Sequence, residues 1–263
     1  MSLYYTSLNS GSNGNCYYVG NEQDAVLVDV GISCRETERR MSALGLPVEK
    51  LRAIFVSHEH ADHIRGVNVL SRKYNIPVYM SVATCLNSLV QVEAGLMRTF
   101  SACEKLEIAS LAVHAFPKQH DSIDPYSFTV SYKGATVGVF TDIGEACPNL
   151  VQHFSNCHAA FLEANYDEDM LENGKYPVYL KRRISSNFGH LSNRQALDLF
   201  KQHKAPYLSH LILSHLSEHN NHPAILTDLF LPHANGTQIE IASRYAETAV
   251  FYVEAPSSFK AEG

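Results

Sequence analysis

The segment His58-Glu59-His60-Ala61-Asp62-His63 constrains this chain more than any other feature of its sequence. It follows directly on a compact apolar run at 53–57, which is typical of a buried strand. In an extended loop, residues two apart point the same way, so His58 and His60 can bind one metal ion together. Asp62 and His63 come next, at the start of a helix, and can turn towards a second ion. Imidazole and carboxylate ligands suit zinc, manganese or iron(II).

Further candidate ligands stand where other predicted strands end. His120 and His215 each follow an apolar run, and Asp142 closes the second arm of a predicted hairpin, where it could bridge two cations. Asp29 also ends a predicted strand, and an acid there typically accepts a hydrogen bond from a ligand histidine and fixes its tautomer. We therefore predict two divalent metal ions, zinc with manganese or iron as alternatives. The predicted ligands are His58, His60, Asp62, His63, His120, Asp142 and His215, with Asp29 behind them.

The order of apolar runs predicts a mixed fold. Strands are expected at 3–8, 16–19, 25–30, 53–57, 77–80, 111–116, 127–132, 135–140, 159–164, 208–214, 238–242 and 249–253, and helices at 33–44, 67–74, 192–203 and 222–231. Capping-box patterns mark two helix starts, at Ser33 with Glu36 and at Ser192 with Gln195. Strand clusters followed by mixed strand and helix units, in both halves, indicate two sheets covered by outer helices. No internal repeat or linker divides the chain.

Composition narrows the class of protein. Apolar residues make up 45% of the 263 residues, which is enough for a buried core, and the net charge of −6 argues against a general nucleic-acid binder. Six scattered cysteines without a C-x-x-C pair indicate free thiols in a reducing cytoplasm. No apolar run approaches the roughly 18–20 residues of a membrane span. We also expect no secretory signal, because no basic region followed by an apolar segment opens the sequence. The predicted location is cytoplasmic, with no membrane partner.

Four short stretches add to the central motif. They are Ser10–Asn15, Glu163–Asp167, Gly189–Asn193 and Leu213–Ser217. Together with the aspartate at 29, the H-x-H-x-D-H motif and the three later ligands, they make the chain resemble the metallo-β-lactamase-fold metallohydrolases over essentially its whole length. Within that superfamily the chain is most similar to the YycJ (WalJ) group, which is related to ribonuclease Z and to phosphodiesterases of phosphonate metabolism.

The resemblance implies a four-layer αββα sandwich of the α/β (α+β) class, forming a single domain over 1–263 with its site at the sheet edges. The resemblance also implies that a residue of the site donates a proton to the leaving group. Relatives that resemble ribonuclease Z have a histidine near the position of Tyr166 that helps to protonate the leaving oxygen. This chain has a tyrosine there, so Tyr166 and His190 are both candidates. His190 stands just before a capped helix, and a histidine packed at a helix start is the alternative interpretation.

The predicted chemistry is hydrolysis. Two cations close together lower the pKa of a bridging water, so that a metal-bridging hydroxide can attack phosphorus, and Asp62 is placed to orient it. We therefore predict a metal-dependent phosphodiesterase or exonuclease-like nuclease acting on nucleic-acid ends, and the group resemblance favours DNA over RNA. The alternative is an acyl hydrolase of the same fold, acting on a thioester, a lactone or a β-lactam. A non-catalytic metal-binding protein is disfavoured, because every ligand position is filled.

Substrate contacts are predicted from one dense basic run, Lys181-Arg182-Arg183, which lies shortly before His190. Arginine forks match phosphate oxygens, so Lys181 and Arg182, with Asn165, are candidate substrate-binding residues. A solvated helix face explains the same run equally well.

Overall fold

The computed structural model describes residues 2–254 and contains strands in both halves of the chain. The strands are β1 (Ser2–Asn9), β2 (Cys16–Gly20), β3 (Ala25–Val28), β4 (Leu51–Phe55), β5 (Val78–Ser81), β6 (Met97–Phe100), β7 (Lys105–Ile108), β8 (Leu111–Pro117), β9 (Tyr126–Tyr132), β10 (Ala135–Phe140), β11 (Ala159–Glu163), β12 (His210–Ser214), β13 (Gln238–Ile241) and β14 (Phe251–Glu254). They form two seven-stranded sheets in the orders β14-β1-β2-β3-β4-β5-β6 and β13-β12-β11-β10-β9-β8-β7.

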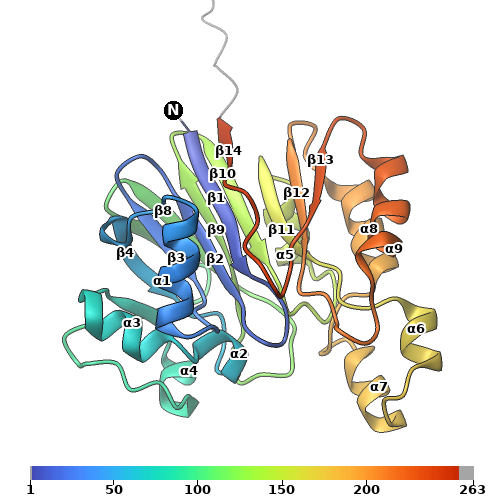
Figure 1. The fold of residues 1–263 in the computed structure, drawn as a ribbon, viewed down its shortest axis with the longest axis horizontal. Helices are drawn as coiled ribbons and strands as arrows, with labels where there is room; N and C mark the ends of the chain where they lie inside the picture. Colours follow the sequence, from blue (N-terminus) through green and yellow to red (C-terminus); the bar gives the residue numbers. More distant parts are fainter. Residues whose placement is uncertain (1, 255–263) are drawn as a thin grey trace, which may run out of the picture.

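Helices lie on the outer faces of the two sheets and, in the case of α2, α6 and α7, at one edge of the sandwich (Figure 1). They are α1 (Cys34–Ala43), α2 (Ala61–Ile64), α3 (Val67–Tyr74), α4 (Val82–Asn87), α5 (Pro148–Phe154), α6 (Glu168–Asn173), α7 (Val178–Ile184), α8 (Asn193–His203) and α9 (Pro223–Phe230), with 3₁₀ turns η1 (Val48–Lys50) and η2 (Leu231–His233). Figure 1 shows α1 and α3 on the side of the first sheet, and α8 and α9 on that of the second. The predicted αββα sandwich is confirmed. Within residues 2–254 no helix is both long and apolar enough to cross a membrane.

The main core fills the space between the two sheets. Tyr17 and Phe55 from the first sheet meet Phe128 and Phe161 from the second, and all four side chains are fully buried. The ring of Tyr17 lies 4.9 Å from that of Phe161, and the ring of Phe55 lies 5.4 Å from that of Phe128. Because aromatic side chains bury large apolar areas, these contacts hold the two sheets in one relative position.

The parallel strands of the second sheet end together at one edge. β10, β11, β12 and β13 are parallel neighbours, and their register places Phe140 beside Leu162, Leu162 beside Leu213, and Leu213 beside Ile241. The residues that follow these positions therefore emerge side by side. In the first sheet, β3, β4, β5 and β6 are parallel in the same way. Ligands of open parallel sheets bind outside such carboxyl ends.

The sequence patterns located most elements to within a few residues. The capping box at Ser192 and Gln195 is present in full at the start of α8. At α1 only half of it forms: the Ser33 side chain accepts from the Glu36 backbone, but the Glu36 carboxylate binds Arg39 and Arg40 instead of returning to the cap. The elements α4, β6, β7, α5, α6 and α7 were not predicted, because their runs are short and mostly polar or exposed.

Candidate metal centre

A first group of three histidines meets at the edge of the sandwich. His58 and His60 follow β4, and His58 Nε2 lies 3.1 Å from His60 Nδ1. A ring nitrogen of His120, after β8, lies within 4.8 Å of both. His120 Nδ1 donates to the Gly189 carbonyl at 3.0 Å, which leaves Nε2 for the cluster. His58 Nδ1 is likewise held by Ser57 Oγ at 2.9 Å. Each ring thus turns one nitrogen to a common point.

A second group lies beside the first and contains Asp62, His63 and His215. His63 Nε2 is 3.5 Å from Asp62 Oδ2, and His215 Nε2 is 3.8 Å from the same oxygen. Asp29 accepts a hydrogen bond from His63 Nδ1 at 2.7 Å, so the other ring nitrogen faces the group. Asp29 also accepts from the backbone and the hydroxyl of Ser57, both at 2.8 Å. The structure therefore places Asp29 directly behind His63 and, through Ser57 Oγ, behind His58.

Asp142 lies between the two groups. Its Oδ2 is 3.2 Å from His63 Nε2, and its Oδ1 is 3.7 Å from His120 Nε2. Asp142 and His215 follow β10 and β12, and both adopt left-handed backbone, with φ of 55° and 58°. Asp29 does so after β3, with φ of 60°. The left-handed conformation is uncommon for residues other than glycine. Here Asp29, Asp142 and His215 all adopt it, and their side chains enter one cluster.

Two residues of the cluster were missed by the sequence analysis as functional side chains. Glu163, the last residue of β11, is fully buried and accepts from His215 Nδ1 at 2.8 Å and from His190 Nδ1 at 2.9 Å. Asn15 places its amide nitrogen 3.1 Å from His63 Nε2. Glu163 could have been found by the same strand-end rule that selected Asp142. Asn15 carries no comparable signal, because it follows a loop and precedes a strand.

The electrostatics of the cluster favour bound cations. Burial alone would lower the pKa of His63 and His215, but carboxylates outweigh it. Asp142 and Asp29 hold the pKa of His63 well above its usual value. Asp142 and Asp62 raise the pKa of His215 to about 10. Burial would raise the pKa of Asp142, yet the two histidines hold it well below its ordinary value. The buried carboxylates thus remain charged and draw positive charge to them, which divalent cations would supply in place of the protons on His63 and His215.

The donor set fits divalent metal ions. Burial lowers the pKa of His58 well below its usual value and that of His120 to about 4, so both rings are neutral, as a metal ligand must be. Among the described residues, Asp142 Oδ2 and His215 Nε2 are buried polar atoms without a hydrogen-bond partner. Buried polar groups are rarely left unpaired, and both atoms face the cluster. Neutral imidazole nitrogens and carboxylate oxygens are the ligands that zinc, manganese and iron accept.

The two candidate proton donors differ in their relation to this cluster. His190 is part of it, with Nδ1 bonded to Glu163 and 3.8 Å from Asp142 Oδ1. Tyr166 is buried, pairs through its backbone with Ser192, and has its pKa raised to about 12 by burial. A hydroxyl with that pKa is a weak proton donor near neutral pH.

Of the three candidate substrate-binding residues, one contacts the cluster and two do not. Asn165 is buried and donates its amide to the His215 carbonyl at 2.7 Å, so it braces a ligand. Lys181 and Arg182 lie on α7, and Lys181 Nζ donates to the Glu172 carbonyl at 2.5 Å. Arg183, beside them, pairs with Asp121. Within residues 2–254, no hydrogen bond or ion pair connects Lys181 or Arg182 to the histidine cluster.

Comparison with known proteins identifies the family. Residues 24–216 match the model of the beta-lactamase superfamily domain. The chain is 33% identical over 224 residues to the exodeoxyribonuclease YycJ of Bacillus anthracis, covering 84% of this chain and 85% of that protein. It is 31% identical to the exodeoxyribonuclease WalJ of Streptococcus pneumoniae, covering 82% of each.

A solved structure agrees on the fold. The metallo-β-lactamase-fold protein YhfI from Bacillus subtilis superposes with a TM-score of 0.74 at 17% identity, over 96% of this chain and 99% of that one. The family match spans most of the chain, and two relatives with more than 30% identity cover more than two thirds of it. The chain therefore belongs to the beta-lactamase superfamily, as a metal-dependent hydrolase of the metallo-β-lactamase fold.

Proposed function

We propose that this hydrolase is a two-metal phosphodiesterase that degrades DNA from its ends. The observation that carries the proposal is the position of Asp142, which lies within 3.7 Å of His120 in the first group and within 3.2 Å and 3.6 Å of His63 and His215 in the second. A carboxylate shared in this way suits a pair of cations. The relatives named exodeoxyribonucleases support a nucleic-acid substrate, and DNA in preference to RNA.

The proposed chemistry divides between the ions and the side chains. Bound divalent cations would polarise the phosphoryl group and make a water nucleophilic near neutral pH. His58, His60, His120 and Asp142 would hold one ion, and Asp62, His63, His215 and Asp142 the other. Zinc is the first candidate for both, with manganese or iron as alternatives. Asp29 and the Gly189 carbonyl fix the rings of His63 and His120, as partners of metal-binding histidines commonly do.

We assign the proton transfer to His190. Glu163 accepts from its Nδ1, which fixes the ring and leaves Nε2 outside that bond. The His190 side chain is 20% exposed, whereas Glu163 is fully buried, so a substrate can reach the histidine but not the acid. His190 can therefore protonate the leaving oxygen while Glu163 holds it in place. Lys181 and Arg182 on α7 remain proposed contacts for phosphates further along the chain of the substrate.

The test is a panel of substrates with defined metals. Purified protein with Mn²⁺ or Zn²⁺ is offered bis-p-nitrophenyl phosphate, end-labelled DNA, end-labelled RNA, a thioester and nitrocefin, and its metal content is measured. We expect hydrolysis of the phosphodiester and of DNA, about two ions per chain, and loss of both activities in His60→Ala. Hydrolysis of the thioester or nitrocefin alone would reject the proposal. Equal activity in His60→Ala would show that a contaminant is responsible.

The setting proposed for this activity is the cytoplasm. The cysteines at 16, 34, 85, 103, 147 and 157 are all free in the structure, as a reducing compartment would leave them.

A further inference from the structure

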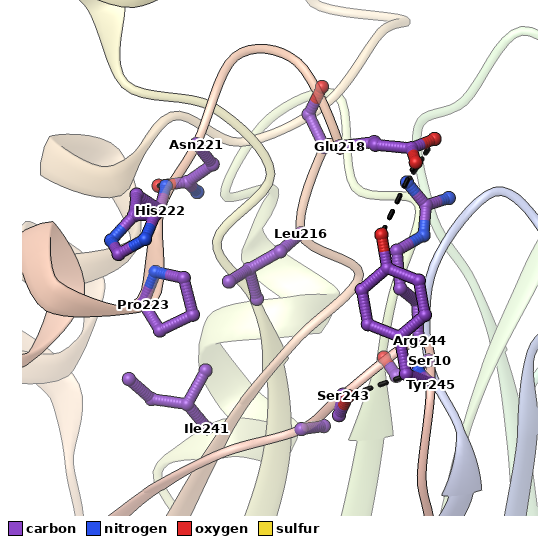
Figure 2. Close-up of a pocket in the computed structure, with 12 residues that line it drawn as sticks. Ser10, Leu216, Glu218, Asn221, His222, Pro223, Ile241, Ser243, Arg244 and Tyr245 are labelled. Atoms are coloured by element: carbon purple, nitrogen blue, oxygen red, sulfur yellow. Dashed lines mark hydrogen bonds and ion pairs between the residues drawn. The ribbon is translucent and has the colours of Figure 1, made fainter.

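A cavity of about 410 Å³ opens beside the metal centre, and the proposed chemistry assigns nothing to it (Figure 2). Its walls come from the loop after β12, the start of α9, the end of β13 and the residues that follow β13. The volume is in the range of about 300–1,000 Å³ found for small-molecule sites.

The sheet register places this cavity one strand beyond the metal ligands. Leu213 of β12 pairs with Ile241 of β13, so Ser243 emerges next to His215 at the same edge. Neighbouring strands are about 4.8 Å apart, so the cavity begins within a few ångströms of His215, a predicted metal ligand. Ser10 joins the two features, because its hydroxyl accepts from the His215 backbone at 2.7 Å and its own N–H donates to Ser243 at 3.2 Å.

The cavity has apolar walls and an aromatic ring. Figure 2 shows Leu216, Pro223 and Ile241 around the hollow, with the ring of Tyr245 at the other side. Tyr245 is 73% exposed, although aromatic side chains are usually covered. Its backbone is fixed, since Tyr245 N donates to Ser243 Oγ at 3.0 Å. An exposed ring on a fixed backbone, facing an apolar wall, suits a flat ligand that stacks.

The arginine that lines the cavity is not free to bind a phosphate. Arg244, the cation among its lining residues, is paired with Glu218 at 2.8 Å, and the Tyr245 hydroxyl donates to the same carboxylate at 3.3 Å. The ion pair carries no net charge, so the guanidinium is not free to bind an anion. At the opposite end lies the imidazole of His222, whose Nδ1 accepts from Ala224 N at 3.2 Å, so that its Nε2 lies outside that bond (Figure 2). The matching ligand is neutral and flat, with apolar faces and polar edges.

We propose that this cavity binds the base of a nucleotide that flanks the scissile phosphate, with Tyr245 stacking on it. The inference rests on the proposed function, because it requires a nucleic-acid substrate at the metal centre. It adds a second anchoring point to that function: the phosphate is held by the ions, and the adjoining base by the cavity. Stacking on an aromatic ring tolerates any base, so the site recognises the presence of a base and not its identity.

The experiment compares oligonucleotides that differ by one base. Three single-stranded DNAs are used: a complete one, one abasic on the 5′ side of the cleaved bond, and one abasic on the 3′ side. Cleavage is measured as kcat/KM, and binding by fluorescence anisotropy with chelator present, so that one readout needs no metal. In the unmodified protein, we expect one abasic DNA to be cleaved and bound about tenfold less well than the complete one.

Variants locate the effect in the cavity. Tyr245→Ala should remove most of that tenfold discrimination, and Ile241→Trp, which fills the hollow, should do the same. Tyr252→Ala is the matched control, because Tyr252 is 61% exposed and lies on β14 outside the cavity. Equal binding of all three DNAs, or discrimination that survives in Tyr245→Ala, would overturn the inference. Failure to cleave bis-p-nitrophenyl phosphate or any DNA would instead reject the proposed function, while the metal-free binding readout still judges the cavity.

Discussion

At the scale of single residues, the proton donor is the most specific proposal to test. His190→Ala should lower kcat on DNA by about 10²–10⁴, because general acid catalysis contributes about that much. The same variant should retain far more of its activity on bis-p-nitrophenyl phosphate, whose leaving group departs without a proton. Tyr166→Phe should change neither rate greatly. An equal loss on both substrates would contradict the assignment, and metal analysis of each variant shows that the ions remain bound.

Asp29 makes a second prediction at this scale. Asp29→Asn keeps the shape of the side chain but replaces a carboxylate that holds both His63 and Ser57. Losing such a partner typically costs about 10–100-fold in metal affinity. Competition with a chromogenic chelator measures this affinity directly. Asp228→Asn, an aspartate on α9 outside the candidate metal groups, is the control and should bind metal like the unmodified protein. Equal affinities in the two variants would rule out the positioning role.

The sequence located much of this cluster but not all of it. Motif spacing and strand ends led to the seven predicted ligands, and the structure brings them together. Glu163 was overlooked, because the predicted strand ran to 164 and placed this carboxylate inside the strand, whereas β11 ends at Glu163. The position of Asn15 depends on the close approach of two loops. A Cβ on Gly31 would lie only 1.6 Å from the Asp62 carbonyl, and such proximity has no signature in the spacing of residues.

At the scale of elements, Arg40 joins α1 to β1 of the first sheet and pairs with Glu36 of its own helix, and this ion pair gives a pH-dependent stability. Arg40 is 5% exposed, and it donates to Glu36 at 2.6 Å and to the Leu8 carbonyl at 2.7 Å. Hydrogen bonds from Arg39 and the charge of Arg40 lower the pKa of Glu36 from 4.5 to about 2. A carboxyl with a lowered pKa stabilises the fold above its unfolded pKa, and that contribution is lost as the pH falls from 4.5 towards 2.

Glu36→Gln should therefore reduce the free energy of unfolding by about 1 kcal/mol at pH 7, and the difference from the unmodified protein should shrink as the pH falls below 4.5. Urea denaturation at a series of pH values measures it. Glu22→Gln, at an exposed site, is the control and should show little difference at any pH. A difference that stays constant down to pH 3 would mean that the carboxylate charge of Glu36 does not stabilise the helix.

Local patterns also explain which elements could be predicted. Strong alternation around a Lys133-Gly134 turn indicated the hairpin of β9 and β10, and the structure has it. β6 and β7 are four-residue strands at sheet edges, and most of their side chains are exposed or only partly buried. Such strands are held by pairing with a neighbour, which a local pattern does not reveal. The helices α6 and α7 were also missed. Most of their residues are exposed or partly buried, so they show little of the periodic burial that marks a helix.

At the scale of the whole molecule, we propose that the two sheets unfold as a single domain. Their shared core contains side chains from both halves, including Tyr17 with Phe161 and Phe55 with Phe128. Unfolding in urea should therefore show one transition with the same midpoint by far-ultraviolet circular dichroism and by fluorescence of the 14 tyrosines, in a chain without tryptophan. Two separated transitions, or midpoints that differ between the probes, would show that the sheets are independent units.

The metal centre should add to the stability of the whole molecule, because its ligands come from both sheets. His58, His60 and His63 follow β4 of the first sheet, whereas Asp142 and His215 follow β10 and β12 of the second. A ligand that binds only the folded state at 1,000 times its Kd stabilises by about 4 kcal/mol. For a chain of this size, that corresponds to a Tm higher by roughly 10 °C.

Removing the ions with a chelator should therefore lower Tm by about 10 °C, and adding Zn²⁺ or Mn²⁺ back should restore it, as measured by differential scanning calorimetry. Asp142→Asn should lose most of this response, because it removes the carboxylate shared by both groups while keeping a residue type that tolerates left-handed backbone. His114→Ala is the matched control: His114 lies on β8, outside the candidate metal groups, and its variant should respond like the unmodified protein. An unchanged response in Asp142→Asn would mean that the ions act elsewhere on the molecule.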